Sequence, residues 1–290
     1  MNVVLHVLAR EGTGFHQLET LFLRLALGDG VTIRITSGGI VLDARGDAMP
    51  PEGLGPTEKN LAYRAARAYQ AATHWPPGCQ VQVDKRIPVG GGLGGGSADA
   101  GAVLRILDAL SPHPLGDRLI ELATSLGADV PFLTTESPFA LGWGRGERLL
   151  PLPVPPQRTV VLALPSFGVG TAEAYGWMAA QRGNEPQKSW SAARSLGPAE
   201  GLASWDTLAH LSANDFEAVV EARHPALGRI RSALQSAGAG IARMSGSGST
   251  VFGVFEGQPA PGGLTAVHAE GARTVVTRSA DSVAAVEFTD

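Results

Sequence analysis

The sequence predicts an α+β protein. Its 290 residues exceed one average domain, and 44% of them are hydrophobic, which is enough to bury a sizeable core. Strand-like and helix-like segments mix without the regular βαβα order of a doubly wound parallel sheet, which favours an α+β architecture. A glycine-rich run at residues 88–99 joins a strand pattern to a helix pattern. We therefore expect one or two globular domains, with a glycine loop in the first half of the chain.

The individual elements follow from hydrophobic periodicity. In the N-terminal half it predicts strands at 2–8, 31–36 and 80–85, and helices at 59–73, 98–110 and 116–126. Residues 181–205 are rich in Gly, Pro, Ser, Gln and Arg, and we expect a surface loop or insertion there. Asn214-Asp215-Phe216-Glu217 has the form of a capping box that opens a helix. His224-Pro225 interrupts this helix, and a second helix ends at Gly238, so the second half looks like an α+β unit of its own.

Charge and composition exclude several classes of protein. The net charge is −4 and there is no basic cluster, which argues against a nucleic-acid partner or a membrane-surface partner. Cys79 is the single cysteine, so neither a disulfide framework nor a thiolate zinc site is expected, and a buried structural thiol is the simplest interpretation. No apolar run reaches the roughly 18 residues of a membrane span. We expect a cytoplasmic protein, and the sequence leaves its oligomeric state open.

The glycine run is a candidate phosphate-binding loop. Six glycines fall within residues 90–96. Glycine enters positive φ freely, so such a loop can turn its N–H groups around an anion, and the following helix adds its positive N-terminal end. The alternation in 81–84 is typical of a strand that Pro88 closes, and apolar residues recur at helical spacing from Ala100. Ser97 and Asp99 are candidate N-caps for that helix.

Comparison with known phosphate loops narrows the choice. A P-loop requires Gly-Lys-Ser/Thr at the helix start, and no such lysine is present. Gly90, Gly92 and Gly95 match the dinucleotide spacing G-x-G-x-x-G, but Pro88 interrupts the direct turn from strand to glycine that this motif needs. A dehydrogenase and a flexible Gly-rich linker both stay open at this point.

Asp129 is a candidate catalytic carboxylate. Gly127 suits the end of a helix, and Pro131 should force Val130 into an extended conformation, which would present Asp129 at a helix-to-strand junction. A carboxylate there could accept a proton from a hydroxyl or orient it. Lone aspartates in turns, however, more often cap local backbone groups.

Two further segments contain candidate site residues. Residues 244–250 form a glycine-serine turn that runs into the apolar residues 251–255, which suit a buried strand. This turn could brace a neighbouring loop, touch an anion, or be a simple hairpin turn. His16 taken alone suggests a surface histidine.

Taken together, these segments resemble the GHMP kinase family, and within it the 4-diphosphocytidyl-2-C-methyl-D-erythritol kinases of non-mevalonate isoprenoid biosynthesis. Residues 88–99 look like the family's phosphate loop, 126–132 like its catalytic-aspartate segment, and 244–250 like its C-terminal glycine motif. The supporting matches are Phe15-His16 with Leu18, Thr20, Leu21 and Phe22, together with Gly144-Arg145-Gly146-Glu147, Thr171 to Tyr175 and Asn214-Asp215. The combination is more specific than any single motif.

The resemblance implies a two-domain enzyme with its active site between the domains. Residues 1–155 would form an α+β domain like one found in ribosomal proteins, and 156–290 a ferredoxin-like α/β sandwich. The implied reaction transfers the γ-phosphoryl group of ATP, with Mg²⁺, to the 2-hydroxyl of the methylerythritol moiety of the cytidine diphosphate-linked substrate.

The resemblance also implies roles for individual residues. Asp129 would accept or orient the hydroxyl proton, and Asn2 falls on the family's active-site asparagine. His16 would bond the cytosine edge, Phe15 or Tyr175 would stack on the ring, and Thr171 would belong to the substrate site. The phosphates of ATP would be held by Pro88, Val89, Gly90, Gly91, Gly92, Leu93, Gly94, Gly95, Gly96, Ser97 and Ala98. Metal ligands stay unassigned.

The sequence departs from the family pattern at three places. The family's catalytic lysine would lie one position before Met1, which indicates either a start assigned too far downstream or a divergent enzyme. Phe15 replaces the usual tyrosine, and Ala98 replaces a second serine, which leaves Ser97 as the hydroxyl at the loop end. Two alternatives stay open: another GHMP kinase acting on a small alcohol such as homoserine or mevalonate, and a nucleotide-binding homologue that does not catalyse.

Overall fold

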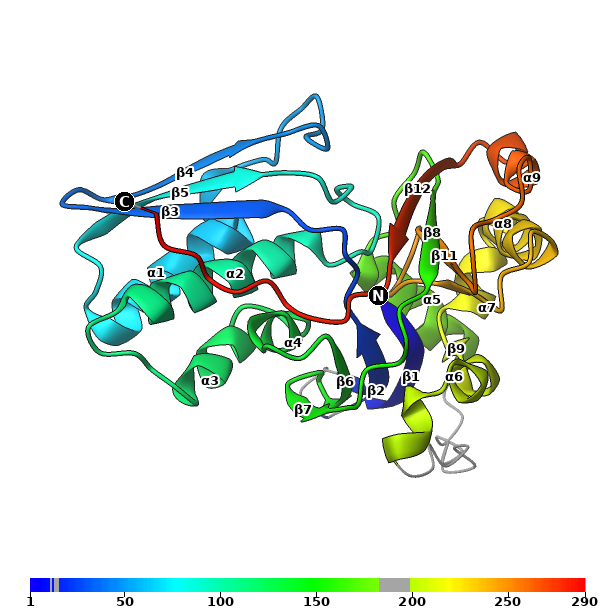
Figure 1. Cartoon of the computed structure of the whole chain (residues 1–290), viewed down its shortest axis with the longest axis horizontal. Coiled ribbons are helices and arrows are strands. Elements are labelled where there is room, and N and C mark those ends of the chain that lie inside the picture. The colour runs from blue at the N-terminus through cyan, green and yellow to red at the C-terminus, as the bar shows by residue number, and fades with distance from the viewer. Residues whose placement is uncertain (11, 13–15, 183–198, 290) are drawn as a thin grey trace. The chain divides into compact units, whose positions relative to one another are not determined.

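The computed structural model of the chain describes residues 1–10, 12, 16–182 and 199–289 (Figure 1). It is a mixed α+β protein, as the sequence predicts. Its contacts divide it into two compact units. The first unit comprises Met1–Ala26, Gly90–Leu93 and Pro138–Asp281, and the second comprises Leu27–Val89, Gly94–Ser137 and Ser282–Asp290. The domain boundary expected between residues 155 and 156 stays a prediction, because compact contact units need not coincide with domains.

The first unit contains two sheets. One has the strand order β7-β6-β2-β1-β9, in which β1 runs antiparallel to β2 and parallel to β9. The other has the order β10-β11-β8-β12 and is antiparallel throughout. The strands are β1 (Asn2–Arg10), β2 (His16–Leu23), β6 (Phe139–Gly144), β7 (Arg148–Pro151), β8 (Thr159–Leu164), β9 (Ala213–Asn214), β10 (Ile241–Met244), β11 (Val251–Phe255) and β12 (Arg273–Arg278). The helices are α5 (Thr171–Arg182), α6 (Trp205–Leu211), α7 (Glu217–Glu221), α8 (Pro225–Ser236) and α9 (Thr265–Ala269), with a 3₁₀ turn at Ala199–Ala203.

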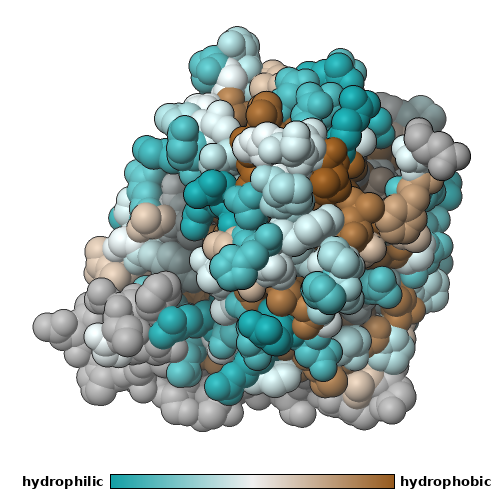
Figure 2. All heavy atoms as spheres, turned by 90° about the vertical axis from the view of Figure 1, so that its left-hand side faces the viewer, coloured by the Kyte–Doolittle hydropathy of each residue, from teal (hydrophilic) through white to brown (hydrophobic). Residues whose placement is uncertain are grey.

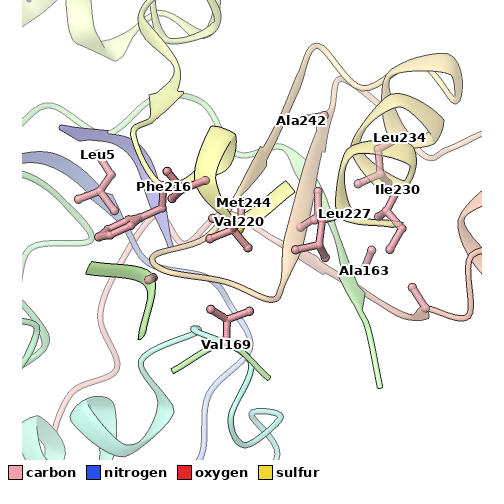
Figure 3. Close-up of a cluster of buried hydrophobic side chains, with 14 of the residues drawn as sticks. Leu5, Ala163, Val169, Phe216, Val220, Leu227, Ile230, Leu234, Ala242 and Met244 are labelled. Carbon is pink, nitrogen blue, oxygen red and sulfur yellow. The ribbon is translucent and has the colours of Figure 1, made fainter. Parts of the chain in front are cut away.

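The core of the first unit extends from α8 and the four-stranded sheet to α5, α7 and β1 (Figure 3). Leu227, Ile230 and Leu234 recur at helical spacing on one face of α8, and all three are fully buried. Every residue of β8 and β11 is buried too, as the apolar run 251–255 predicts. The predicted break at residues 224–225 is confirmed, because α7 ends at Glu221 and Pro225 opens α8, where its missing N–H costs nothing.

The predicted capping box at residues 214–217 is wrong. Asn214 Oδ1 does accept a hydrogen bond from Phe216 N, at 2.9 Å. The carboxylate of Glu217 does not return to Asn214; it accepts from Met244 N on β10, at 2.8 Å. A capping box needs both bonds to be local, and here a partner distant in sequence takes the second. The N-cap of α7 is Phe216, whose side chain makes no capping bond.

The second unit is a three-stranded sheet with helices on one face (Figure 1). Its strands are β3 (Gly30–Thr36), β4 (Ile40–Arg45) and β5 (Gly78–Asp84), in the order β3-β5-β4, and its helices are α1 (Leu61–Thr73), α2 (Gly95–Leu110), α3 (Arg118–Thr124) and α4 (Val130–Thr134), with a 3₁₀ turn at Thr57–Lys59. Cys79, Val81 and Val83 alternate along β5 and pack into the same core as α1 and α2. Cys79 is fully buried, as the simplest interpretation of a lone thiol predicts.

Helix α2 begins three residues earlier than predicted. Gly94 ends the loop with a left-handed φ of 69°, and the helix starts at Gly95. Ser97 and Asp99 therefore lie inside the first turns, and the prediction that they cap the helix is wrong. The two glycines made the sequence look non-helical, but the first turn of a helix tolerates them when contacts elsewhere fix the backbone.

The surface seen in Figure 2 is largely hydrophilic, with apolar residues between the polar ones. In the part of the chain that the structure describes, no helix combines the length and apolar character that crossing a membrane requires. Most of the predicted loop at 181–205 lies outside the described residues. Its described ends are not loop as predicted, because α5 continues to Arg182, a 3₁₀ turn covers Ala199–Ala203, and α6 begins at Trp205.

Candidate active site

The glycine run is a loop between β5 and α2, as predicted. Gly90, Gly92 and Gly94 have φ values of 81°, 74° and 69°. Residues with a Cβ rarely adopt this region, so the alternation explains why glycine recurs here. Backbone that alternates in this way can gather successive N–H groups around an anion. The conformation therefore suits the predicted phosphate loop.

The first half of the loop, residues 90–93, is braced by the turn at residues 245–250, which we call the Ser-Gly turn. Thr250 N donates to Gly91 O at 3.1 Å, and Ser245 Oγ donates to Gly92 O at 3.2 Å. A Cβ on Gly92 would lie 2.6 Å from the Gly248 carbonyl oxygen, so the approach excludes any side chain. The turn also joins the paired strands β10 and β11. It is thus both a connection between hairpin strands and a brace for the neighbouring loop, two of the interpretations that the sequence left open.

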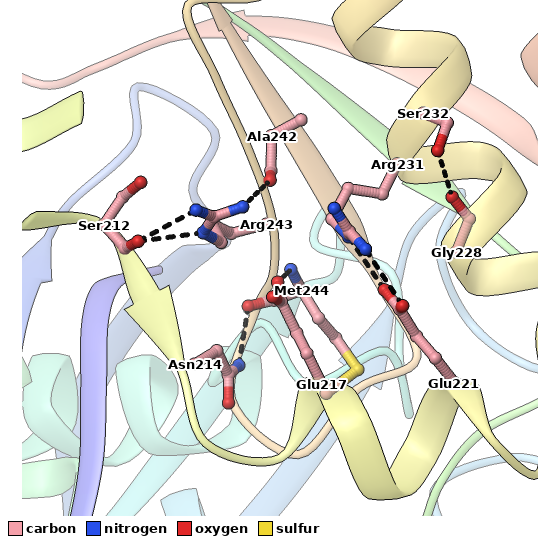
Figure 4. A network of polar contacts seen from close by, with 10 residues as sticks. All are labelled: Ser212, Asn214, Glu217, Glu221, Gly228, Arg231, Ser232, Ala242, Arg243 and Met244. Carbon is pink, nitrogen blue, oxygen red and sulfur yellow. Dashed lines mark hydrogen bonds and ion pairs between the residues drawn. The ribbon is translucent and has the colours of Figure 1, made fainter. Parts of the chain in front are cut away.

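Further polar side chains bond to or lie against the Ser-Gly turn, and Figure 4 shows one of them, Asn214. Asn214 Nδ2 donates to Met244 O and Gly246 O, both at 2.8 Å. Ser249 Oγ donates to the Phe167 carbonyl, and the Ser247 and Thr171 hydroxyls lie 3.1 Å apart. The turn is therefore fixed by hydrogen bonds at several of its residues.

The second half of the loop, from Gly94 onward, belongs to the second unit, where a cluster of buried charges lies beside it. Lys85 Nζ pairs with the Asp29 carboxylate and with Asp99 Oδ2, the latter at 2.8 Å, and the three side chains are 2–4% exposed. Asp29 Oδ1 also accepts from Arg86 N at 2.6 Å and Ile87 N at 2.8 Å. This cluster fixes the backbone between β5 and the glycines.

The two carboxyls of the cluster ionise differently. Burial raises the pKa of Asp99 to about 7, and the bond from Lys85 only partly opposes this. Burial also acts to raise the pKa of Asp29, but hydrogen bonds from Ile87 N, the Lys85 side chain and Arg86 N lower it overall. Asp29 is therefore the ionised partner of Lys85, while Asp99 takes up a proton near neutral pH. Asp99 Oδ1 is buried without a hydrogen-bond partner.

Asp129 lies between α3 and α4, and the predicted helix-to-strand junction is wrong. Val130 begins the short helix α4, and Pro131 occupies its first turn, where a missing N–H is tolerated. Asp129 immediately precedes this helix, but its side chain makes no capping bond, so the local-cap interpretation is wrong as well. A Cβ on Gly94 would lie 3.9 Å from Asp129 Oδ2, which places the carboxylate beside the start of α2.

The surroundings of Asp129 favour its protonated form. Its side chain is exposed by surface area, yet protein atoms crowd around it and raise the pKa of the carboxyl by desolvation. Because water still reaches the side chain, the desolvation is partial. A carboxylate with a raised pKa is a stronger base than an ordinary aspartate.

His16, Tyr175 and Thr171 all belong to the first unit. The rings of His16 and Tyr175 stack with centroids 4.3 Å apart and planes 17° from parallel, and His16 is half-buried. Tyr175 in turn meets the edge of Phe216 at 4.9 Å. Thr171 lies one turn before Tyr175 on α5. Phe15, the alternative stacking ring, lies outside the described residues.

Asn2 lies on β1, close to the Ser-Gly turn. Its Nδ2 donates to Thr20 Oγ1 at 2.9 Å, and the Thr20 hydroxyl donates onward to Val4 O at 2.7 Å. A Cβ on Gly246 would lie 3.8 Å from Asn2 Oδ1. The fold therefore brings Asn2 to the turn that braces the glycine loop.

Sequence reasoning missed Lys85 and its two carboxylates. The lysine directly follows the alternation of β5, which made it look like the solvated end of a strand. Its partners Asp29 and Asp99 are 56 and 14 residues away along the chain. The available signal was an aspartate on the same helical face as Val103 and Leu107, where a charge needs a partner.

Two models of the GHMP kinase family match the chain. The N-terminal domain model covers residues 60–137 and the C-terminal model covers residues 194–272. A 4-diphosphocytidyl-2-C-methyl-D-erythritol kinase of Anaeromyxobacter dehalogenans (strain 2CP-C) is 41% identical over 270 residues, which span 91% of this chain and 80% of that protein. The kinase of the same name from Moorella thermoacetica is 38% identical over 281 residues, or 96% of both chains.

Solved structures show the same relationship. The crystal structure of a 4-(cytidine 5'-diphospho)-2C-methyl-D-erythritol kinase matches with a TM-score of 0.73 and 34% identity over 96% of both chains. A homoserine kinase from Cytophaga hutchinsonii matches with a TM-score of 0.68 but 17% identity, covering 92% of this chain and 89% of the other, which shows a shared fold alone. The two-domain α+β architecture expected from the sequence is confirmed.

Proposed function

Because the chain belongs to the 4-diphosphocytidyl-2-C-methyl-D-erythritol kinases of the GHMP kinase family, we propose that its glycine loop and Asp129 carry out the reaction. It is a phosphotransferase with an alcohol acceptor, and the reaction moves the γ-phosphoryl group of ATP to the 2-hydroxyl of the methylerythritol moiety. The observation that carries the residue assignment is the Asp129 carboxylate beside Gly94, where the loop enters α2.

The loop from Pro88 to Ala98 holds the phosphates of ATP. The positive φ values of Gly90, Gly92 and Gly94 leave backbone N–H groups able to converge on an anion, and the N-terminal end of α2 adds a favourable dipole. Phosphoryl transfer depends mainly on in-line positioning and on neutralising charge at the phosphate oxygens. A rigid loop of backbone donors meets both needs.

Asp129 accepts or orients the proton of the attacking hydroxyl. Its raised pKa brings it nearer the working pH, where general-base catalysis is most effective. Its carboxylate makes no capping bond, which leaves it available to a substrate hydroxyl. Asn2, the second proposed catalytic residue, lies close to Gly246 in the turn that braces the first half of the loop.

The cytidine end of the substrate binds at His16, Tyr175 and Thr171, with Phe15 as a further candidate. The His16 ring can bond the cytosine edge while an aromatic ring supplies a stacking surface. The Thr171 hydroxyl, which lies 3.1 Å from Ser247, offers a further polar contact.

A magnesium ion would arrive with the nucleotide. The described residues contain no group of three or more His, Cys, Asp and Glu side chains that could hold a metal alone. That fits Mg²⁺, which in kinase sites usually takes one or two carboxylates and completes its shell with phosphates and water. The Asp129 carboxylate lies beside Gly94 at the start of α2 and would supply a protein ligand. When bound, the ion would neutralise charge on the phosphate oxygens.

The test is a substrate panel with ATP consumption as the readout. We expect turnover with 4-diphosphocytidyl-2-C-methyl-D-erythritol and none with homoserine or mevalonate. Phosphorylation of homoserine or mevalonate in place of the cytidine compound would contradict the assignment. ATP binding by calorimetry without turnover on any acceptor would instead indicate a non-catalytic homologue.

A further inference from the structure

We infer that Asn214 is a positioning residue for ATP, which acts by setting the conformation of the Ser-Gly turn. This inference rests on the proposed function, because it assumes that the glycine loop binds the phosphates of ATP. Asn214 ends β9 in the first unit and is 7% exposed. It contacts the glycine loop through other residues, so its effect must pass through the turn.

The amide of Asn214 uses both of its ends, and Figure 4 shows its bond to the Met244 carbonyl. The nitrogen Nδ2 donates to the carbonyl oxygens of Met244 and Gly246, both at 2.8 Å. The oxygen Oδ1 accepts from Phe216 N at 2.9 Å. An amide offers two N–H donors and an acceptor in one plane, and each of them has a partner here. The two carbonyls it holds lie on either side of Ser245.

Ser245 links this support to the loop. Its hydroxyl donates to Gly92 O at 3.2 Å, and its own backbone N–H donates to Thr250 O at 2.9 Å. Thr250 N then donates to Gly91 O at 3.1 Å. The path from Asn214 to two consecutive carbonyls of the glycine loop therefore combines hydrogen bonds with the backbone of residues 244–246 and 250, all within the first unit.

Other hydrogen bonds hold the turn at Ser247 and Ser249, whereas Asn214 bonds to the carbonyls of Met244 and Gly246. Gly246 has a φ of 57°, one of several regions that glycine adopts freely, so its φ alone does not fix the turn. Glu217 fixes the N–H of Met244 but not its carbonyl. Removing the Asn214 donors would leave two carbonyls without these partners, and the turn would relax away from Gly91 and Gly92.

The variant Asn214→Asp tests the donors with little change in shape. Its carboxylate can still accept from Phe216 N but faces two carbonyl oxygens with no proton to donate. We expect the KM for ATP to rise about tenfold. The KM for the cytidine substrate and kcat should each change by less than about threefold, because the variant alters nucleotide binding rather than the chemical step.

Arg231→Gln is the matched control. Arg231 forms a two-bond ion pair with Glu221, at 2.8 and 3.0 Å, and joins α8 to α7 in the same part of the unit (Figure 4). Its loss should lower thermal stability without changing the KM for ATP. Asn214→Ala removes the donors without placing a carboxylate beside the carbonyls. It should show the same KM effect as Asn214→Asp and provides a second test if one variant folds poorly.

A double-mutant cycle with Ser245→Ala shows whether the effect passes through the turn. If it does, the combined rise in the ATP KM will be smaller than the product of the two single effects. An unchanged ATP KM in both Asn214 variants, or fully multiplicative effects, would overturn the inference. These two outcomes differ from failure of the proposed function, in which the wild-type chain itself would not turn over the cytidine substrate.

Discussion

The two halves of the glycine loop are held by different chemistry. Residues 90–93 are braced by neutral hydrogen bonds from Ser245 and Thr250. From Gly94 onward the loop lies beside the ion cluster of Lys85, Asp29 and Asp99, which is almost fully buried. A neutral hydrogen bond contributes about 0.5–1.5 kcal/mol, whereas a buried charge without its partner costs several times as much. The first half can thus be adjusted by small changes, while the second half is fixed.

Asp129 lies beside the second half of the loop, at Gly94, and substituting it should have the largest effect on turnover. Asp129→Ala removes the proposed base, and we expect kcat to fall by about 10²–10⁴-fold while the affinity for ATP stays nearly unchanged. Steady-state kinetics and ATP titration measure the two separately. Asp117→Ala is the control, since Asp117 is exposed and makes no capping bond to α3. Wild-type turnover in Asp129→Ala would remove Asp129 from its proposed role.

Removing the cation of the buried cluster should have the largest effect on stability. Lys85→Met leaves Asp29 and Asp99 buried without Lys85, and we expect a loss of about 3–5 kcal/mol in the free energy of unfolding. Urea denaturation checks this. Arg86→Met is the matched control. Arg86 directly follows Lys85 but pairs with Asp84 on the surface, where the two side chains are 63% and 44% exposed. That loss should stay below about 1 kcal/mol, and equal losses would sink the distinction between the two halves.

The pH dependence of stability separates the two carboxyls of the cluster. The pKa of Asp99 is about 7 in the folded chain against an ordinary value of 3.8. Between these values the folded state holds a proton that the unfolded state has released, so Asp99 makes stability fall as pH rises through this range. Asp29 acts in the opposite direction, but its lowered pKa places its effect at more acidic pH.

Asp99→Asn tests this assignment because asparagine stays neutral at every pH. The loss of unfolding free energy between about pH 5 and about pH 8 should be smaller in the variant than in the wild-type chain. Urea denaturation at both pH values supplies the comparison. A slope as steep as that of the wild-type chain would show that another group titrates.

Local patterns predicted much of the fold. The buried strand 251–255, the break at residues 224–225 and the order of strand, glycine loop and helix all follow from periodicity and from proline. Prediction failed where a distant partner decided the local structure. Glu217 bonds to Met244 rather than closing a capping box, and α2 starts at Gly95 because the preceding glycines have fixed left-handed conformations.

The candidate site divides in the same way. The glycine run and Asp129 carry recognisable patterns of their own, and the family resemblance supplied His16, Tyr175 and Thr171. Lys85, Asp29 and Asp99 form a site feature only once the chain has folded, because no short spacing joins them. Asn214 was noted for a helix cap, whereas its amide supports a turn 30 residues away. Polar residues that act over long range leave little trace in a single sequence.

The smallest expected effect concerns the neutral brace of the first half. Ser245→Ala removes a single bond of 3.2 Å to the Gly92 carbonyl, and we expect the KM for ATP to rise only about two- to fivefold. Ser249→Ala is matched to it, because both serines belong to the same turn and are at most 1% exposed, but Ser249 bonds to the Phe167 carbonyl instead of the loop. Both variants should lose similar stability, while only Ser245→Ala should change ATP binding. If Ser249→Ala raises the KM for ATP equally, the turn acts as one rigid body, and the single contact at Gly92 does not set the conformation of the first half.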